Sequence, residues 1–232
     1  MPSLDELSLE ALRAHAVETY RAGRGTRPEV MLIEVGDERA VLKDFSRSDP
    51  WFGRMIGPLA AYREARALRL LEGVPGIPGL IRRVNPRAIL MQHIDGVPAK
   101  QTPKGVVGPE VFDRLYRLVE AMHQRGVAHC DLRSGGNTLI DSHGQPYFVD
   151  FVSHCVRGRR WNLFLRWAFG KFCEADRVAV ARLKKRLAPD LLTAEEMHGL
   201  ERDRTMLLGR IARFIGDSTR KLSRLILTRK KA

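Results

Sequence analysis

Four polar side chains in the stretch 118–151 have types and spacing that could handle protons and metal ions. His129 and Asp131 are separated by one residue, Asn137 follows in the same segment, and Asp150 comes after a further short apolar run. A carboxylate can accept a proton from a hydroxyl group, and carboxylate and amide oxygens are ligands that Mg²⁺ prefers. Taken singly, a His-x-Asp loop is more often a capped turn. Their joint order favours a shared site, because unrelated turns have no reason to follow a particular order.

Hydrophobic segments around these residues predict the elements that position them. A helix is expected where apolar residues recur at helical spacing before Gly126: Leu115, Leu118, Val119 and Met122. Two short strands are expected at Thr138–Ile140 and Tyr147–Val149, with an Asp-Ser-His-Gly turn between them. The predicted order is helix, loop and hairpin, which places the polar side chains at one edge of the hairpin.

This ordered set resembles the catalytic segment of the protein-kinase-like superfamily, in which an H-R-D-x-x-x-x-N loop is followed by D-F-G. The matching residues are His129-Cys130-Asp131, Asn137 and Asp150-Phe151. The resemblance implies that Asp131 is the catalytic base, that Asn137 and Asp150 bind Mg²⁺, and that His129 supports the loop. It also implies an α+β, two-lobed fold with a small β-rich N-lobe and a reduced helical C-lobe.

The segment departs from the superfamily pattern at three points. Cys130 stands in place of the arginine, so a switch that pairs this arginine with a phosphorylated activation loop is not expected. Val152 replaces the glycine of D-F-G. The step from Asp131 to Asn137 is one residue longer than the pattern, and Gly135-Gly136 can absorb the extra residue in a tight bend.

The N-terminal part of the chain resembles the nucleotide-covering part of the same fold. Residues 7–20 predict a packing helix with Ser8 as its N-cap, which leaves little room for a strand before the next segment. That segment, G-R-G-T-R-P-E-V at 23–30, resembles the loop G-x-G-x-x-G-x-V, with Pro28 in place of the third glycine. Two glycines beside an arginine are also common in ordinary turns. The nucleotide contacts that the resemblance implies are Gly23, Gly25 and Val30.

A lysine and a glutamate follow that could form an ion pair. Val30–Val35 and Ala40–Phe45 predict a hairpin with a four-residue connection, and the V-L-K ending in Lys43 resembles the kinase V-A-I-K, whose lysine contacts ATP phosphates. The predicted helix 59–71 contains one acid, Glu64, which is therefore the expected partner of Lys43. The alternative is that both side chains face solvent.

The remaining small-lobe segments complete this organisation. Strands are expected at Leu80–Val84 and Ala88–Met91. The segment 91–96, M-Q-H-I-D-G, resembles the hinge between kinase lobes, which implies that Met91 and His93 contact the adenine. The expected regions are an N-terminal helix at 1–20, an N-lobe at 21–95, a C-lobe with the catalytic loop at 96–200, and a basic amphipathic helix at 201–232.

The C-lobe is expected to be short. Helices are predicted from near Pro109, at Glu174–Leu187, and after a Thr193-Ala-Glu-Glu196 capping box. Only 153–160 separate the D-F motif from the next element, and no A-P-E motif follows. This short C-lobe without an activation segment resembles that of the smaller kinases of the superfamily. These are the RIO-type kinases and the bacterial sugar kinases that phosphorylate the lipopolysaccharide core. The resemblance covers about residues 21–190.

Composition places the chain among ordinary globular proteins. Its 232 residues are 44% hydrophobic and 29% charged, which suffices for a sizeable core. Three cysteines, Cys130, Cys155 and Cys173, are too few and too scattered in sequence for a disulfide framework or a zinc site. The N-terminus lacks the basic and apolar regions of a signal peptide. We therefore expect a cytoplasmic protein.

Two stretches carry the whole net charge of +13: residues 157–171 and residues 204–232. The first overlaps W-N-L-F-L-R-W-A-F-G-K-F at 161–172, which is too short to span a bilayer but has the aromatic and basic residues of a headgroup boundary. A buried C-lobe helix is an equal alternative for 161–172. The second carries apolar residues at helical spacing among basic ones. Together they predict peripheral binding to an anionic membrane at its cytoplasmic face.

These observations together predict an ATP- and Mg²⁺-dependent phosphotransferase with a hydroxyl acceptor. A glycolipid or lipopolysaccharide sugar, a small alcohol and a protein serine are all open as the acceptor. One alternative is a pseudokinase that binds nucleotide without turnover in a membrane scaffold. Another is a nucleic-acid-associated kinase or binding protein, because basic tails also bind phosphodiester backbones.

Overall fold

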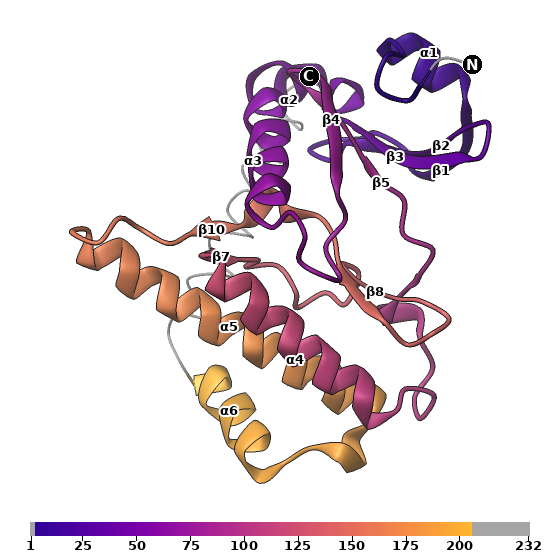
Figure 1. The fold of residues 1–232 in the computed structure, drawn as a ribbon. Coiled ribbons are helices and arrows are strands. Elements are labelled where there is room, and N and C mark those ends of the chain that lie inside the picture. Colours follow the sequence, from indigo (N-terminus) through magenta and orange to yellow (C-terminus); the bar gives the residue numbers. More distant parts are fainter. Residues whose placement is uncertain (1–2, 206–232) are drawn as a thin grey trace, which may run out of the picture.

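The chain folds into two lobes, one built on a sheet and one built from helices (Figure 1). The computed structural model describes residues 3–205. Five antiparallel strands form the sheet in the order β1-β2-β3-β5-β4. Their bounds are β1 Ala16–Arg21, β2 Glu29–Val35, β3 Glu38–Asp44, β4 Leu80–Asn85 and β5 Ala88–Gln92. The expected α+β, two-lobed fold is confirmed in this arrangement.

The first strand replaces part of the helix that the sequence predicted at 7–20. Helix α1 covers only Leu9–Ala14, and Ser8 caps it by accepting a hydrogen bond from the amide of Ala11. β1 then pairs with β2. Residues 17–20 of this edge strand are all exposed, so they lack the apolar alternation that indicates a strand. Pairing with β2 satisfies backbone groups that a longer helix would have paired internally, and the helix prediction was wrong here.

The β2–β3 hairpin is tighter than predicted. Val35 pairs directly with Glu38, so Gly36-Asp37 forms a two-residue connection in place of the expected four. Gly36 has φ of 59°, a left-handed conformation that two-residue hairpin turns require. The strands at the other end of the sheet, β4 and β5, lie where the sequence predicted them.

One hydrophobic core runs through both lobes. Helix α3, Gly57–Leu70, follows the short helix α2, Pro50–Met55, and packs against the sheet and the turn at 151–153. Phe45, Leu68 and Ile89 from the small lobe belong to the same buried cluster as Leu115 and Phe151 from the large lobe. The lobes are therefore held together by apolar contacts directly beside Asp150.

The helical lobe surrounds the short strands that carry the polar loop. Its helices are α4 Pro109–Gln124, α5 Leu163–Leu187 and α6 Ala194–Thr205. Its strands are β6 Val97–Pro98, β7 Val127–Ala128, β8 Thr138–Ile140, β9 Pro146–Phe148 and β10 Cys155–Val156. Short 3₁₀ turns lie at Phe45–Arg47, Ala99–Gln101, Phe151–Ser153 and Pro189–Leu191. The helix, loop and hairpin order is confirmed, with β9 beginning one residue earlier than predicted.

Helix α5 joins two segments that the sequence treated separately, 161–172 and Glu174–Leu187. Of the five aromatic residues in 161–172, only Phe169 is buried, whereas Trp161, Phe164 and Trp167 are 55–75% exposed. A fully buried helix at 161–172 is therefore excluded. No helix among residues 3–205 combines the length and apolar character needed to cross a membrane.

The capping box before α6 is formed as predicted. The hydroxyl of Thr193 accepts a hydrogen bond from the amide of Glu196, and the carboxylate of Glu196 accepts one from the amide of Thr193. The basic amphipathic helix predicted at 201–232 lies outside the described residues from 206 onward.

The three cysteines are scattered in sequence but gather in space. Cys173 is buried with Ala128 and Phe169, and Cys130 and Cys155 pack against this group. All three are free thiols. Burial raises the pKa of Cys173 to about 12, so this thiol is protonated at neutral pH. The cluster is therefore apolar packing beneath the polar loop.

Candidate active site

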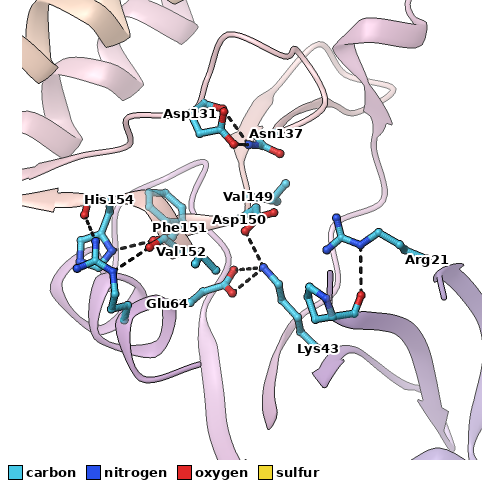
Figure 2. Close-up of polar contacts among 12 residues, drawn as sticks. Arg21, Lys43, Glu64, Asp131, Asn137, Val149, Asp150, Phe151, Val152 and His154 are labelled. Atoms are coloured by element: carbon cyan, nitrogen blue, oxygen red, sulfur yellow. Dashed lines mark hydrogen bonds and ion pairs between the residues drawn. The ribbon is translucent and has the colours of Figure 1, made fainter. Parts of the chain in front are cut away.

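Lys43, Glu64 and Asp150 meet at the junction of the lobes (Figure 2). Nζ of Lys43 lies 2.8 Å from Oε1 and 2.6 Å from Oε2 of Glu64. It also donates a hydrogen bond of 2.7 Å to Oδ1 of Asp150. Lys43 on β3 and Glu64 on α3 are both buried, whereas the side chain of Asp150 is 31% exposed. The ion pair predicted from the sequence is formed, and the solvent-facing alternative is excluded.

This arrangement keeps a cation in the site at neutral pH. Burial alone lowers the pKa of an amine, but Asp150 and Glu64 outweigh it and raise the pKa of Lys43. Burial raises the pKa of Glu64, against the opposing effect of Lys43. Burial also acts to raise the pKa of Asp150, but Lys43 outweighs it, so the net pKa of Asp150 is lowered. Asp150 is therefore an anion that reaches the cleft.

Asp131 and Asn137 lie together across the polar loop. The side-chain nitrogen of Asn137 donates to the backbone oxygen of Asp131 at 2.8 Å and to its Oδ2 at 3.0 Å. Gly135 has φ of 60°, so the extra residue of the loop is absorbed in a left-handed bend at Gly135-Gly136 as predicted. The carboxylate of Asp131 is on an exposed residue, where an acceptor hydroxyl can approach.

His129 ties the loop to the strand that ends at Asp150. Its Nδ1 lies 3.3 Å from the amide nitrogen of Asp131, and its Nε2 lies 3.0 Å from the oxygen of Val149. An amide can only donate, so Nδ1 accepts and Nε2 carries the proton. The imidazole is fully buried and sits 4.5 Å from the ring of Phe151, centroid to centroid. These contacts support the scaffold role expected for His129.

A residue that the sequence reading missed, Asp176, organises the loop from below. Its carboxylate accepts hydrogen bonds from the amides of His129 at 2.7 Å and Cys130 at 2.9 Å. It also lies 3.1 Å from Nε2 of His123 on α4. Cys130 has φ of 67°, so these bonds hold the residue before Asp131 in a left-handed conformation. The sequence did contain a signal for Asp176: it is an acid on the apolar face of α5, between the buried residues Cys173 and Val180.

Arg21 is a second cation at the site. The sequence did not single it out, because it follows directly after a helix that was expected at residues 7–20. It ends β1, and its Nε donates to the oxygen of Pro28 at 3.3 Å. Figure 2 shows its guanidinium directed toward the side of the cleft where Asp150 lies. The charge of Arg21 also contributes to lowering the pKa of Asp150. Two cations, Arg21 and Lys43, therefore flank the same carboxylate.

The glycine-rich loop forms a small hairpin tied to the segment after β3. The amides of Arg24 and Arg27 bond to each other's carbonyl oxygens, and the amide of Gly25 donates to Oδ1 of Asp49 at 3.2 Å. A side chain at Gly23 would meet the backbone of Arg47 at 2.6 Å. Three amides of the loop therefore donate to oxygens of the protein itself. Nucleotide contacts by Gly23, Gly25 and Val30 stay a prediction.

The predicted hinge residues lie at the end of β5 and directly after it. Met91 lies in β5 opposite Val41, and its side chain belongs to the core. Nε2 of His93 lies 3.0 Å from the hydroxyl of Tyr20 on β1. The segment that follows β5 therefore lies close to β1, the strand that ends at Arg21. Adenine contacts of Met91 and His93 also stay a prediction.

The residues at the cleft fit a magnesium ion held with a nucleotide. Mg²⁺ is usually bound through one or two carboxylates together with phosphates and waters. Asp150 offers a carboxylate, and Asn137, whose side-chain nitrogen is used by Asp131, offers its Oδ1. Among residues 3–205, no three His, Cys, Asp or Glu side chains form a metal site by themselves. Bound phosphates would therefore have to supply further oxygen ligands.

The sheet, the Lys43–Glu64 pair and the loop before Asp150 together define a protein-kinase-like fold. Similar solved structures include two crystal structures of Rio2 kinase from Chaetomium thermophilum, one of them an ADP/Mg²⁺-phosphoaspartate complex. The complex has a TM-score of 0.60 and 20% identity, and the match covers 82% of this chain and 62% of that one. The other has a TM-score of 0.59 and 20% identity, with 82% and 64% covered.

The likeness to Rio2 kinase is one of fold. This chain spans less than two thirds of the length of either Rio2 structure. No model of a protein family matches the sequence. No curated protein matches it either.

Proposed function

We propose that this protein is an ATP-dependent phosphotransferase that moves the γ-phosphate to a hydroxyl acceptor. The observation that carries the proposal is the buried Lys43, held between Glu64 and Asp150 in the cleft that Asp131 also borders. A buried ion pair with a third, partly exposed carboxylate is costly to maintain as packing alone. It is well suited to a site where phosphate charge must be neutralised.

Each residue has a distinct role in the proposed reaction. Lys43, fixed by Glu64, and Arg21 neutralise phosphate charge. Asp150, with Asn137, would hold Mg²⁺, which would supply positive charge to neutralise the phosphates. Asp131 orients the acceptor hydroxyl and accepts its proton. The chemistry depends on positioning and electrostatics, which is why the tethering of the loop by His129 and Asp176 matters.

ATP and Mg²⁺ as ligands are supported by the ADP/Mg²⁺ complex of the similar Rio2 kinase. The acceptor classes that we propose are a glycolipid sugar, as in lipopolysaccharide, and a protein serine. The test is incubation of the full chain with γ-labelled ATP and a cell-envelope extract, followed by separation of lipid, protein and soluble metabolites. Asp131→Asn is the matched control, because it keeps the shape and size of the side chain.

This experiment, together with measurements of nucleotide binding and nucleic-acid binding, distinguishes the proposed function from its alternatives. Label in one fraction that depends on Asp131 identifies the acceptor class and supports the kinase. Nucleotide binding without label transfer or ATP consumption would replace it with the pseudokinase alternative. Binding to nucleic acid that weakens steeply with salt, without lipid involvement, would favour the nucleic-acid-associated alternative.

We also propose that the protein binds peripherally to an anionic membrane surface through the start of α5. Trp161 just before the helix and Leu163, Phe164 and Trp167 in its first turns are all more than half exposed. Residues 157–171 contain five Lys or Arg and no acid. In Figure 1 the first turns of α5 extend past α4 at one side of the molecule. Exposed aromatic residues among basic ones suit a lipid headgroup boundary, where each basic residue contributes about 1 kcal/mol.

Vesicle flotation tests the membrane proposal. The full chain is compared with Trp161→Ser/Phe164→Ser/Trp167→Ser, because these exposed side chains can change without opening the core. Anionic vesicles should carry the unmodified chain upward, neutral vesicles should not, and the triple variant should stay largely in the pellet. Equal flotation of the unmodified chain and the triple variant would contradict a membrane contact at the start of α5. A further chain truncated after Gly216 separates the contribution of the basic C-terminal segment.

A further inference from the structure

A cavity of about 410 Å³ lies beside the proposed catalytic cleft and has no role in the proposed transfer reaction. It is bordered by α3, by the residue before Asp131, by the segment after Asp150 and by α5. Its lining includes Arg63, Arg66, Cys130, Ser153, His154 and Phe172. A volume of this size is within the range of small-molecule sites.

The cavity is positively charged. Arg63 and Arg66 stand three residues apart on α3, so their side chains leave the same face of the helix. None of the described lining residues is acidic. Burial and then the charges of Arg63 and Arg66 lower the pKa of His154 to about 4, so the imidazole is neutral and adds no further cation. The two guanidinium groups have no anionic counterpart in the lining.

The two arginines differ in how they are held. Arg63 donates from Nε to the oxygen of Val152 at 2.9 Å and from Nη2 to the oxygen of His154. These bonds fix its guanidinium at the wall of the cavity. Arg66 is exposed, and its guanidinium makes no hydrogen bond or ion pair among residues 3–205. One cation is therefore pre-positioned, and the other is available for a ligand.

We propose that this cavity binds a phosphate monoester, with Arg66 and Arg63 as its cationic partners and Ser153 as a hydroxyl donor. A guanidinium group matches the paired oxygens of a phosphate. The bound dianion would link α3 to the segment after Asp150. Because Glu64 follows Arg63 directly, this link would favour the arrangement in which Glu64 holds Lys43. The site is separate from the proposed ATP site, and its existence does not depend on phosphoryl transfer.

The phosphate could be carried by a soluble molecule or by a lipid headgroup. Phe172 both lines the cavity and belongs to the exposed aromatic segment of α5. The cavity therefore lies next to the surface proposed to contact a membrane, where a lipid phosphate could enter it. Glycerol phosphate serves as the soluble probe. Vesicles of phosphatidic acid in phosphatidylcholine present the same monoester on a lipid, and pure phosphatidylcholine vesicles are their control.

Amide NMR of the full chain measures binding at constant ionic strength, with chloride as the balancing ion. Glycerol phosphate should shift the amides of Arg66 and residues 153–156 in a saturable manner. Arg66→Ala should weaken this binding by about tenfold or more, the loss expected for one charge-assisted hydrogen bond. Arg69→Ala is the matched control, since Arg69 is an exposed arginine one turn further along α3 that does not line the cavity.

The NMR results distinguish a soluble phosphate monoester from a lipid headgroup, and they can also contradict the proposed phosphate site. Binding of glycerol phosphate establishes a soluble ligand class. Saturable shifts only with phosphatidic acid vesicles, lost in Arg66→Ala and kept in Arg69→Ala, assign the lipid headgroup. If residues 153–156 do not shift with either probe, or if both arginine variants weaken binding equally, the cavity is not a phosphate site. A protein without kinase activity that still gives the shifts would leave this inference standing and remove only the proposed function.

Discussion

The carboxylate of Asp176 on α5 accepts a hydrogen bond of 2.9 Å from the amide of Cys130, the residue before Asp131. Cys130 has a left-handed backbone, which costs energy for a residue with a side chain. The same carboxylate accepts the amide of His129. The conformation of the loop beside the proposed base therefore depends on a residue of α5 that lies 46 positions later in the chain.

Asp176→Ala should destabilise the protein and remove activity. It leaves the buried amide of His129 and the partly buried amide of Cys130 without their acceptor. Hydrogen bonds to charged groups contribute about 1.5–3 kcal/mol each. The free energy of unfolding should fall by about 3 kcal/mol or more in urea titrations. Glu174→Ala on the same helix is the control, since its exposed pair with Lys171 should contribute less than about 1 kcal/mol. Equal effects of the two variants would contradict the role of Asp176.

Asp131→Asn and Asp150→Asn should each remove phosphoryl transfer while the protein stays folded. Both side chains lie at the cleft, outside the apolar core. The loss of a general base slows a reaction by at least about 100-fold, and the loss of a metal ligand should have a comparable effect. Initial rates with γ-labelled ATP measure the effect, and circular dichroism checks the fold. Unmodified turnover in either variant would remove the kinase assignment.

Lys43→Met should raise the ATP concentration needed for half-maximal rate and lower the maximal rate. The variant removes the cation between Glu64 and Asp150, so phosphate charge is no longer neutralised there. It also leaves two carboxylates close together, so thermal melting must accompany the kinetics. An ATP titration gives both parameters. A variant with unchanged ATP dependence would mean that another lysine contacts the phosphates.

Arg21→Gln should weaken ATP binding with little effect on folding. Arg21 is on an edge strand, and its described hydrogen bond is to the oxygen of Pro28. Glutamine retains a donor for that oxygen but removes the charge that faces Asp150. The KM for ATP should rise by about tenfold, as expected for the loss of one charge-assisted contact. Arg39→Gln, at the far end of the sheet where Arg39 pairs with Glu34, should leave the KM unchanged.

His154 should make the protein less stable in mild acid. Its pKa is lowered from 6.5 to about 4, first by burial and then by Arg63 and Arg66. Below pH 6.5 the unfolded chain binds a proton that the folded chain does not, so the free energy of unfolding falls as pH falls toward 4. The loss at about pH 5.5 is about 1 kcal/mol.

Urea titrations of the unmodified chain and His154→Gln between about pH 7.5 and pH 5.5 measure this contribution. Glutamine keeps a side-chain donor near the oxygen of Phe151, which Nδ1 of His154 contacts at 2.7 Å. The glutamine variant should show a smaller fall in stability over this range. Parallel pH profiles for both chains would show that His154 is protonated equally in the folded and unfolded states.

The sequence by itself determined the order of the polar residues and the elements that carry them. The spacing of Leu115, Leu118 and Met122 predicted α4, and a lone acid in a basic helix identified Glu64 as the partner of Lys43. These inferences succeeded because helical periodicity and charge composition are local properties that each segment carries with it. The order of the polar residues could then be compared directly with the superfamily pattern.

Only the tertiary structure decided which distant residues reach the loop and the cleft. Arg21 was missed because β1 is an exposed edge strand without apolar alternation, so pairing with β2 overrode a helical pattern. Asp176 and the cavity arginines act across elements that are far apart in sequence. A periodic pattern shows which face of a helix is buried, but it does not show which backbone amides or cavities that face will meet. Those contacts arise when α3 and α5 pack around the loop.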